Sequence, residues 1–179
     1  CLSRGLGDVY KRQGEALLQL RPLTELFRKA KSLGVNTCLD TSAQPFCRKG
    51  DSFSAFKELM RYTDLVLLDI KHIDSDAHRR LTGWRNENIL DCARYLSDIQ
   101  KPVWIRHVSV PGINDDDESL RRLRTFLDTL GNVDRVEVLP YHTLGVYKWD
   151  QLGIPYTLAE VSPPDEESLI HVRRILTGQ

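Results

Sequence analysis

The stretch Thr63-Asp64-Leu65-Val66-Leu67-Leu68-Asp69-Ile70-Lys71 decides the fold of this chain. It begins as a nearly continuous apolar run, which is typical of a strand buried on both faces of a parallel sheet. It then turns polar, and because side chains alternate along a strand, Leu67, Asp69 and Lys71 lie on one side. An acid and an amine at the carboxyl end of such a strand occupy the place where α/β sheets and barrels bind ligands. The alternative is an ion pair that only caps the sheet.

The composition of the 179 residues limits the class of protein. The length fits one domain with a substantial core. Lysine plus arginine and aspartate plus glutamate both total 25, so no basic excess indicates nucleic acid as a partner. No apolar stretch approaches membrane-spanning length, so no membrane association is expected. The four cysteines, Cys1, Cys38, Cys47 and Cys92, form no C-x-x-C pair, which argues against a disulfide framework and favours a cytoplasmic protein.

The first 13 residues, CLSRGLGDVYKRQ, differ in character from the rest of the chain. They show neither helical nor strand periodicity, and the run DVYKRQ looks like translated adapter or vector sequence. We therefore expect residues 1–13 to be a non-native junction and residues 14–179 to be part of a longer domain. A genuine disordered leader is the alternative.

From residue 14 onward, strand and helix patterns alternate along the chain. The patterns predict four strands, at residues 35–41, 63–71, 103–110 and 135–141. They predict helices that begin near Leu23, at Asp51 or Ser52, at Asp74, at Asn86, at the acidic run 115–118 and after Ser162-Pro163-Pro164-Asp165. The helix at the acidic run is expected to end at Gly131, and residues 145–161 are expected to form a loop. This rhythm is that of βα units in a parallel sheet, so the predicted class is α/β.

Polar residues recur at the carboxyl end of each predicted strand. They are Asp40 and Thr41, Asp69 and Lys71, Arg106 and His107, and Tyr141 and His142. In an α/β barrel these ends converge on one mouth. Arg106 and Lys71 supply positive charge suited to a carboxylate or phosphate, and His142 offers a hydrogen-bonding edge and a face for stacking. A structural role is the alternative for both histidines, and it is the favoured one for His107.

The residues alone leave the reaction open. Asp40, Asp69, His107 and His142 have the donor types of a divalent-metal hydrolase site. Lys71, among apolar neighbours, has the surroundings of a Schiff-base lysine. Neither pattern is specific.

From Gly14 onward the chain resembles the pyruvate formate-lyase activating enzymes, a family of radical S-adenosylmethionine proteins. The matching stretches are Gly14-Glu15-Ala16, Thr37-Cys38-Leu39-Asp40-Thr41, residues 63–71, Val103-Trp104-Ile105-Arg106, Val110-Pro111-Gly112, Leu139-Pro140-Tyr141-His142-x-Leu144-Gly145 and Lys148-Trp149. Each is modest alone, but their order along the chain is that of the family. The implied fold is a partial (β/α)6 barrel of the TIM type, of which this chain holds the last four β/α units.

The resemblance also implies which residues contact S-adenosylmethionine. Gly14 and Glu15 match the end of a Gly-Gly-Glu motif that receives the methionine amino group, and Lys71 matches the lysine that pairs with the carboxylate. The full implied cofactor set is Gly14, Glu15, Asp69, Ile70, Lys71, Arg106 and His142. Asp40, Thr41 and the carbonyl of Leu67 match a monovalent-cation site beside the cofactor.

By the same resemblance, the parent enzyme uses a reduced [4Fe-4S] cluster to cleave S-adenosylmethionine. The resulting 5′-deoxyadenosyl radical takes a hydrogen atom from a backbone glycine of pyruvate formate-lyase. The implied electron donor is of the flavodoxin or ferredoxin type, and a monomer is expected. The activating enzyme of another glycyl-radical enzyme is an alternative, because these enzymes share the cofactor motifs.

Three departures from the family pattern stand out. The C-x-x-x-C-x-x-C triad that holds the cluster is absent from the 179 residues, so we expect this chain to be inactive alone. Gln13 stands where the motif has its first glycine, and Ser42-Ala43 stands where the family commonly has Asn-Gly.

An inactive chain can still be a binding scaffold, and Tyr147 and Trp149 are expected at the rim of the mouth. These aromatics either pack under the terminal helix or receive the partner's glycine loop.

Overall fold

The computed structural model describes residues 14–178. The junction expected in residues 1–13 lies outside the described residues. The elements, in chain order, are η2 (Ala16–Gln19), α1 (Leu20–Ser32), β1 (Cys38–Thr41), α2 (Gly50–Arg61), β2 (Leu65–Asp69), α3 (Ser75–Thr82), α4 (Glu87–Asp98), β3 (Val103–Ser109), α5 (Asp117–Leu127), β4 (Val133–Pro140), α6 (Val146–Leu152) and α7 (Glu166–Thr177). No helix within residues 14–178 has the length and apolar character needed to cross a membrane.

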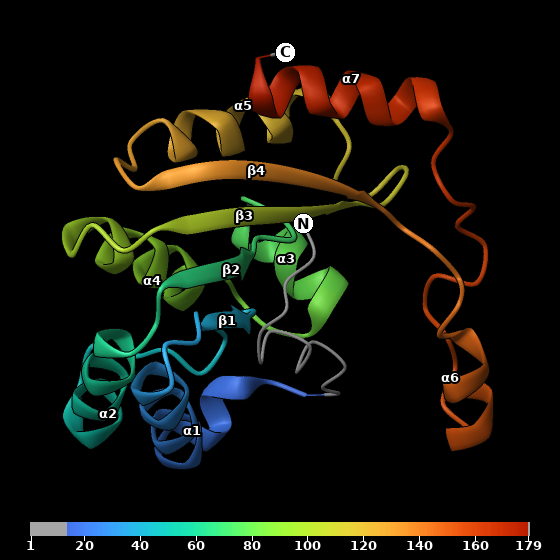
Figure 1. The fold of residues 1–179 in the computed structure, drawn as a ribbon. Coiled ribbons are helices and arrows are strands. Elements are labelled where there is room, and N and C mark those ends of the chain that lie inside the picture. The colour runs from blue at the N-terminus through green and yellow to red at the C-terminus, as the bar shows by residue number, and fades with distance from the viewer. Residues whose placement is uncertain (1–13, 179) are drawn as a thin grey trace.

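The four strands form one parallel sheet in the order β1-β2-β3-β4 (Figure 1). This arrangement confirms the predicted α/β class and is consistent with part of a barrel. In the register, Asp69 of β2 lies beside Arg106 of β3, and Leu67 lies beside both Asp40 of β1 and Trp104 of β3. Because the strands are parallel, all four carboxyl ends meet at one edge of the sheet.

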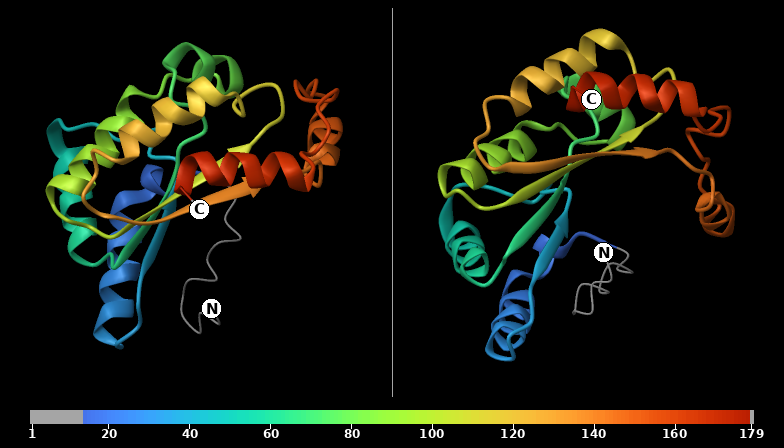
Figure 2. Two further views of the ribbon diagram at one scale, coloured as in Figure 1. Left: turned by 90° about the horizontal axis from the view of Figure 1, so that it is seen from above. Right: turned by 45° about the horizontal axis from the view of Figure 1, so that its top comes forward.

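The two faces of the sheet differ in burial. Side chains on one face, such as Leu68, Ile70 and Ile105, are at most 1% exposed because helices cover them. On the other face Asp69 and Arg106 keep 19% of their side-chain surface exposed. Figure 2 shows that the sheet curves and that most helices lie along its outer side, whereas α6 lies apart from the sheet. The fold therefore directs the polar side chains of β2 and β3 to the uncovered inner face.

Several helix boundaries follow from local signals in the sequence. Asp74, Asp116 and Asp165 precede α3, α5 and α7, and each carboxylate accepts a hydrogen bond from a first-turn amide. Gly34 follows α1 with a φ of 72°, a conformation that glycine adopts without strain. These observations confirm the helix start predicted at Asp74 and the dipole interpretation of the acidic run.

Other predicted boundaries were wrong. Helix α2 begins at Gly50 after Lys49, so neither Asp51 nor Ser52 caps it. Helix α5 ends at Leu127, before Gly131, because residues 128–130 continue as tight turns. Strand β1 is confined to Cys38–Thr41, because the Thr37 amide donates to the Asp64 carboxylate rather than to a neighbouring strand.

The largest correction concerns residues 145–161, which were predicted to be a loop. They contain helix α6, which ends at Gly153 in the left-handed conformation. The helix has no buried residue, so no apolar stripe marks it in the sequence. Figure 1 shows α6 beyond the carboxyl end of β4, apart from the sheet.

Candidate functional site

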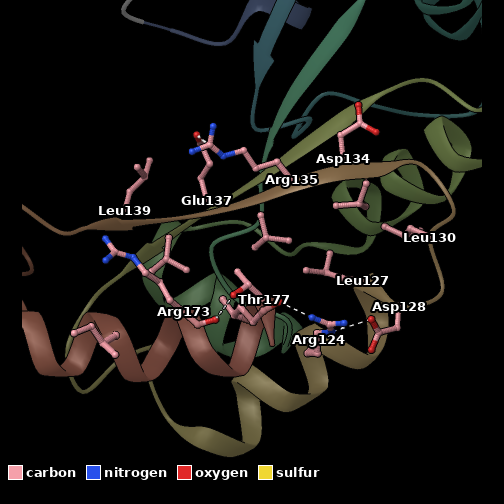
Figure 3. Close-up of a pocket in the computed structure, with 15 residues that line it drawn as sticks. Arg124, Leu127, Asp128, Leu130, Asp134, Arg135, Glu137, Leu139, Arg173 and Thr177 are labelled. Carbon is pink, nitrogen blue, oxygen red and sulfur yellow. Dashed lines mark hydrogen bonds and ion pairs between the residues drawn. The ribbon is translucent and has the colours of Figure 1, made fainter. Parts of the chain in front are cut away.

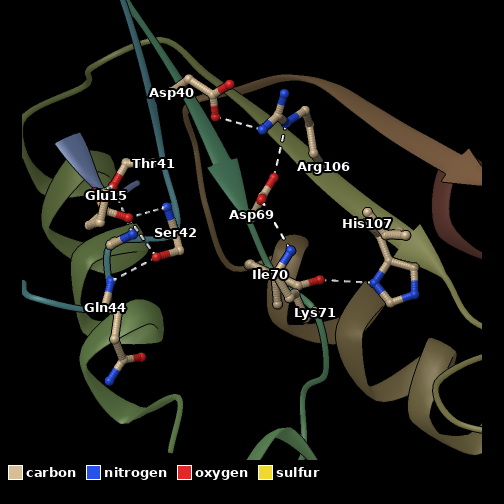
Figure 4. A network of polar contacts seen from close by, with 12 residues as sticks. Glu15, Asp40, Thr41, Ser42, Gln44, Asp69, Ile70, Lys71, Arg106 and His107 are labelled. Atoms are coloured by element: carbon tan, nitrogen blue, oxygen red, sulfur yellow. Dashed lines mark hydrogen bonds and ion pairs between the residues drawn. The ribbon is translucent and has the colours of Figure 1, made fainter. Parts of the chain in front are cut away.

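A cavity of about 330 Å³ lies at the carboxyl ends of the first three strands. It is lined by Gly14, Glu15, Asp40, Thr41, Ser42, Asp69 and Arg106. Six of these seven residues were predicted site residues, and Ser42 had been noted only as a departure from the family pattern. The structure thus brings together residues from the segment before η2, from β1 and the turn after it, and from β2 and β3 (Figure 4).

A chain of alternating charges crosses this cavity. Arg106 donates through Nη2 to Asp40 Oδ1 at 2.5 Å and through Nε to Asp69 Oδ1 at 2.9 Å. Lys71 Nζ lies 3.2 Å from Asp69 Oδ2. Burial by itself lowers the pKa of Arg106, but the charges of Asp69 and Asp40 outweigh it and raise that pKa above its ordinary value. The guanidinium is therefore a fixed positive charge between two carboxylates.

Two buried side chains, those of His107 and Asn114, hold the backbone around Lys71 through hydrogen bonds. His107 shares a 2.9 Å hydrogen bond through Nδ1 with the Ile70 carbonyl, and because a carbonyl only accepts, Nδ1 carries the proton. Asn114 Nδ2 donates to the carbonyls of Lys71 and Val108, both at 2.8 Å. Burial lowers the pKa of His107, which keeps the ring neutral. His107 therefore has the structural role that the sequence favoured.

Asn114 was missed by sequence reasoning. It is 1% exposed, and its Oδ1 accepts from the Val110 amide at 2.7 Å in addition to the bonds that its Nδ2 donates. The available signal was an asparagine two residues after the turn-forming pair Pro111-Gly112, because asparagine side chains often bond the backbone of turns. That signal does not reveal the contact with Lys71, which lies 43 positions away in the sequence.

Three of the predicted cofactor residues, Ile70, Lys71 and His142, do not line the cavity. The Ile70 side chain is 1% exposed on the opposite face of the sheet, its amide donates to the Arg106 carbonyl, and its carbonyl bonds His107. His142 follows β4 and is exposed. The cofactor contacts expected of these residues therefore stay predictions.

The proposed cation ligands are engaged with neighbouring side chains. Asp40 accepts from Arg106, and the Thr41 hydroxyl donates to Glu15 while accepting from the Ala43 amide at 2.9 Å. A cation bound there would share the Asp40 carboxylate with Arg106. The cation site therefore stays a prediction.

The two other chemistries that the sequence left open are not assembled. Within residues 14–178, no group of three or more histidine, cysteine, aspartate or glutamate side chains is placed to hold a metal ion. His107 lies on the covered face of the sheet, whereas Asp69 lies on the uncovered face, so the hydrolase set is divided. Lys71 is 35% exposed and paired with Asp69, unlike the desolvated amine that a Schiff base needs.

A larger cavity, of about 850 Å³, lies between β4 and helices α5 and α7 (Figure 3). Four of its charged side chains form two ion pairs, because Arg124 lies 2.8 Å from Asp128 and Arg135 lies 3.3 Å from Glu137. None of the residues predicted for the site lines this cavity. We therefore place the candidate site at the smaller cavity.

Comparison with known proteins identifies the family of this chain. Residues 13–123 match the model of the radical SAM superfamily, and this segment contains β1 to β3 and every residue that lines the smaller cavity. The chain belongs to the radical SAM superfamily. A solved domain of a pyruvate-formate lyase-activating enzyme from Bacteroides vulgatus shares the fold, with a TM-score of 0.75 and 24% identity over 93% of this chain and 91% of that one.

Two curated radical SAM relatives show a higher identity. The pyruvate formate-lyase-activating enzyme of Staphylococcus epidermidis is 53% identical over 163 residues, which are 91% of this chain and 65% of the relative. The enzyme of the same name from Streptococcus mutans is 49% identical over 170 residues, 95% of this chain and 65% of the relative. The chain therefore spans about two thirds of the length of these relatives. The family resemblance predicted from the sequence is confirmed.

Proposed function

We propose that this chain is the S-adenosylmethionine-binding part of an enzyme that installs a glycyl radical on pyruvate formate-lyase. The observation that carries the proposal is the cavity at the strand ends, where Gly14, Glu15, Asp40, Asp69 and Arg106 meet. The two curated relatives of about half-identical sequence support it. The activating enzyme of a different glycyl-radical enzyme is the alternative, because the cavity residues bind the cofactor and do not select the partner.

The charges around the cavity fit the methionine end of the cofactor, which carries an ammonium and a carboxylate. Lys71 is the partly exposed cation that would bind the carboxylate, exchanging Asp69 for the ligand. The acidic side chains on the same face would attract the ammonium group. His107 and Asn114 would keep Lys71 in place by holding the two carbonyls on either side of its Cα.

The cofactor and a [4Fe-4S] cluster would supply the radical chemistry, and the protein would supply binding, orientation and exclusion of water. The three described cysteines, Cys38, Cys47 and Cys92, do not have the C-x-x-x-C-x-x-C spacing. Cys92 is fully buried, and burial raises the pKa of its thiol. We therefore propose that the cluster ligands lie upstream of Gly14, that residues 14–179 are the native part of the chain, and that the chain alone is inactive.

The remaining features of the proposal rest on the family resemblance and on the composition of the chain. The protein substrate would be pyruvate formate-lyase, and the electron donor would be a flavodoxin or ferredoxin. We propose a cytoplasmic monomer, with a monovalent cation beside the cofactor at Asp40, Thr41 and the Leu67 carbonyl.

The test is a chimera that joins the unmatched third of the Staphylococcus epidermidis relative to residues 14–179 of this chain. After anaerobic reconstitution with iron and sulfide, the chimera is expected to turn brown, to cleave S-adenosylmethionine and to produce the glycyl radical signal on pyruvate formate-lyase. The 179-residue chain, treated in the same way, is the control and is expected to do none of these. A chimera that holds a cluster but neither binds nor cleaves S-adenosylmethionine would refute the proposal.

A further inference from the structure

The carboxylate of Glu15 lines the cavity, yet its hydrogen bonds all run to the protein itself. We infer that Glu15 is a positioning residue that ties the segment at Gly14 to the turn after β1, and that it does not contact the ligand. This inference rests on the proposed function, because it concerns how the same cavity would hold S-adenosylmethionine.

Four donors occupy the Glu15 carboxylate (Figure 4). Oε1 accepts from the Leu17 amide at 3.0 Å and from the Thr41 hydroxyl. Oε2 accepts from the Ser42 amide at 2.9 Å and from the Ser42 hydroxyl at 2.6 Å. Two carboxylate oxygens offer about four lone-pair positions, so the described partners account for the full accepting capacity of this side chain. An ammonium group of a ligand would have to displace one of these donors.

The turn that Glu15 holds is under backbone strain. Ala43 is fully buried and has a φ of 55°, a conformation that residues with a Cβ rarely adopt. Its amide donates to the Thr41 hydroxyl, which in turn donates to Glu15. The carboxylate therefore stabilises the strained turn through Thr41 and Ser42, and Ser42 itself lines the cavity.

The hydrogen bonds from Thr41 and Ser42 to the Glu15 carboxylate form what we call the Glu15 clamp. This clamp gives a role to Ser42, which departs from the family pattern. Its hydroxyl and its amide both donate to one oxygen of Glu15, 27 positions away in the sequence. A side chain without a donor at position 42 would leave only the amide on that oxygen. The identity of residue 42 should therefore affect ligand binding even if Ser42 never touches the ligand.

The experiment measures the dissociation constant of S-adenosylmethionine by calorimetry in the reconstituted chimera and in its variants. Ser42→Ala removes one donor from Glu15, and Ser42→Thr keeps the hydroxyl. Gln44→Ala is the matched control, because only the backbone amide of Gln44 approaches Ser42. In Ser42→Ala we expect a dissociation constant that is roughly three- to tenfold higher, as for the loss of one hydrogen bond. We expect the dissociation constants of Ser42→Thr and Gln44→Ala to equal that of the unmutated chimera.

A double-mutant comparison separates a clamp from a ligand contact. If Glu15 and Ser42 act as one unit, Glu15→Gln with Ser42→Ala should bind no more weakly than Glu15→Gln alone. Hydrogen exchange at the Ala43 amide should be faster in Ser42→Ala, which shows that the turn has loosened. Normal affinity in Ser42→Ala, together with lost affinity in Glu15→Gln, would overturn the inference and make Glu15 a direct ligand. Failure of the unmutated chimera to bind S-adenosylmethionine would instead refute the proposed function.

Discussion

At the scale of single residues, Lys71 shows how the site uses a charge that is already paired within the protein. Its ammonium lies 3.2 Å from Asp69, and 35% of the side chain is exposed. An ion pair at this exposure contributes little to stability, so a ligand carboxylate can replace Asp69 without a large loss. The sequence left two alternatives for Asp69 and Lys71, an ion pair or a ligand-binding site. The observed exposure makes the two roles compatible.

Replacing Lys71 by alanine in the chimera should weaken S-adenosylmethionine binding by about 1.5–3 kcal/mol, the contribution of a hydrogen bond to a charged group. Calorimetry measures this change. Lys31→Ala is the matched control, because Lys31 pairs with Asp64 at 2.7 Å beyond the amino ends of the strands. Borohydride trapping of a carbonyl compound on Lys71 would contradict this role and indicate a Schiff base.

The buried histidines predict how stability depends on pH. Burial lowers the pKa of His72, His78 and His107 in the folded state. The unfolded chain, with an ordinary histidine pKa of about 6.5, binds more protons than the folded chain just below that pH. The free energy of unfolding is therefore highest above about pH 6.5, where these histidines are neutral in both states. It falls as the pH drops from about 6.5 toward the lowered folded-state pKa values.

Urea unfolding of the chimera from pH 7.5 to 5.5 should show stability falling by up to about 1.4 kcal/mol per pH unit for each histidine that stays neutral when folded. A free energy of unfolding that is level between pH 7.5 and 5.5 would show that these rings are protonated in the folded state.

The recurrence of polar residues at the carboxyl ends of the predicted strands allowed Asp69 and Arg106 to be predicted in one site, because the carboxyl ends of such strands converge. The contacts that Asn114 and Glu15 make with distant parts of the chain could not be predicted in this way. Asn114 reaches Lys71 and Glu15 reaches Ser42 across 43 and 27 positions of sequence. Such contacts depend on how loops pack, which local periodicity does not encode.

At the scale of elements, α6 is the part of the chain that the sequence pattern described least well. Tyr147 and Leu152 are 55% and 71% exposed, and Trp149 contacts Tyr156 with ring centroids 5.4 Å apart. Residues 144–154 therefore carry exposed apolar side chains beyond the end of β4 and do not pack as a core element under α7. This exposure favours the prediction that the segment receives the partner's glycine loop.

Replacing Trp149 by alanine in the chimera should slow glycyl-radical formation on pyruvate formate-lyase several-fold and leave S-adenosylmethionine affinity unchanged, because Trp149 does not line the cavity. Electron paramagnetic resonance of the partner and calorimetry of the cofactor measure the two effects. Trp84→Ala is the matched control, since Trp84 is a 65% exposed tryptophan between α3 and α4. Unchanged activity with a lower melting temperature would assign Trp149 a packing role only.

At the scale of the whole molecule, the described residues form an open sheet rather than a closed barrel. Among residues 14–178, β1 pairs only with β2, and β4 pairs only with β3. The alternation of strands and helices was sufficient to predict a parallel sheet, because parallel strands are connected by crossover helices. It could not predict how the edges of the sheet are covered.

The unpaired β1 edge should make the isolated 179-residue chain poorly soluble or molten, because an open edge pairs readily with other chains. Size-exclusion chromatography and calorimetric melting of the isolated chain, beside the chimera, measure this behaviour. A monomer that melts cooperatively above about 50 °C, within the usual range for mesophilic domains, would contradict the prediction.

The alternating row Asp40, Arg106, Asp69 and Lys71 has a consequence for repeated turnover. Each cation in the row has a carboxylate within the protein, so the departure of an external anion leaves no charge without a counter-ion. In the proposed enzyme, Asp69 would take Lys71 back as the spent methionine leaves, without any movement of the strands that carry them. The binding site would then be restored between rounds, and the next cofactor molecule would meet the same geometry as the first.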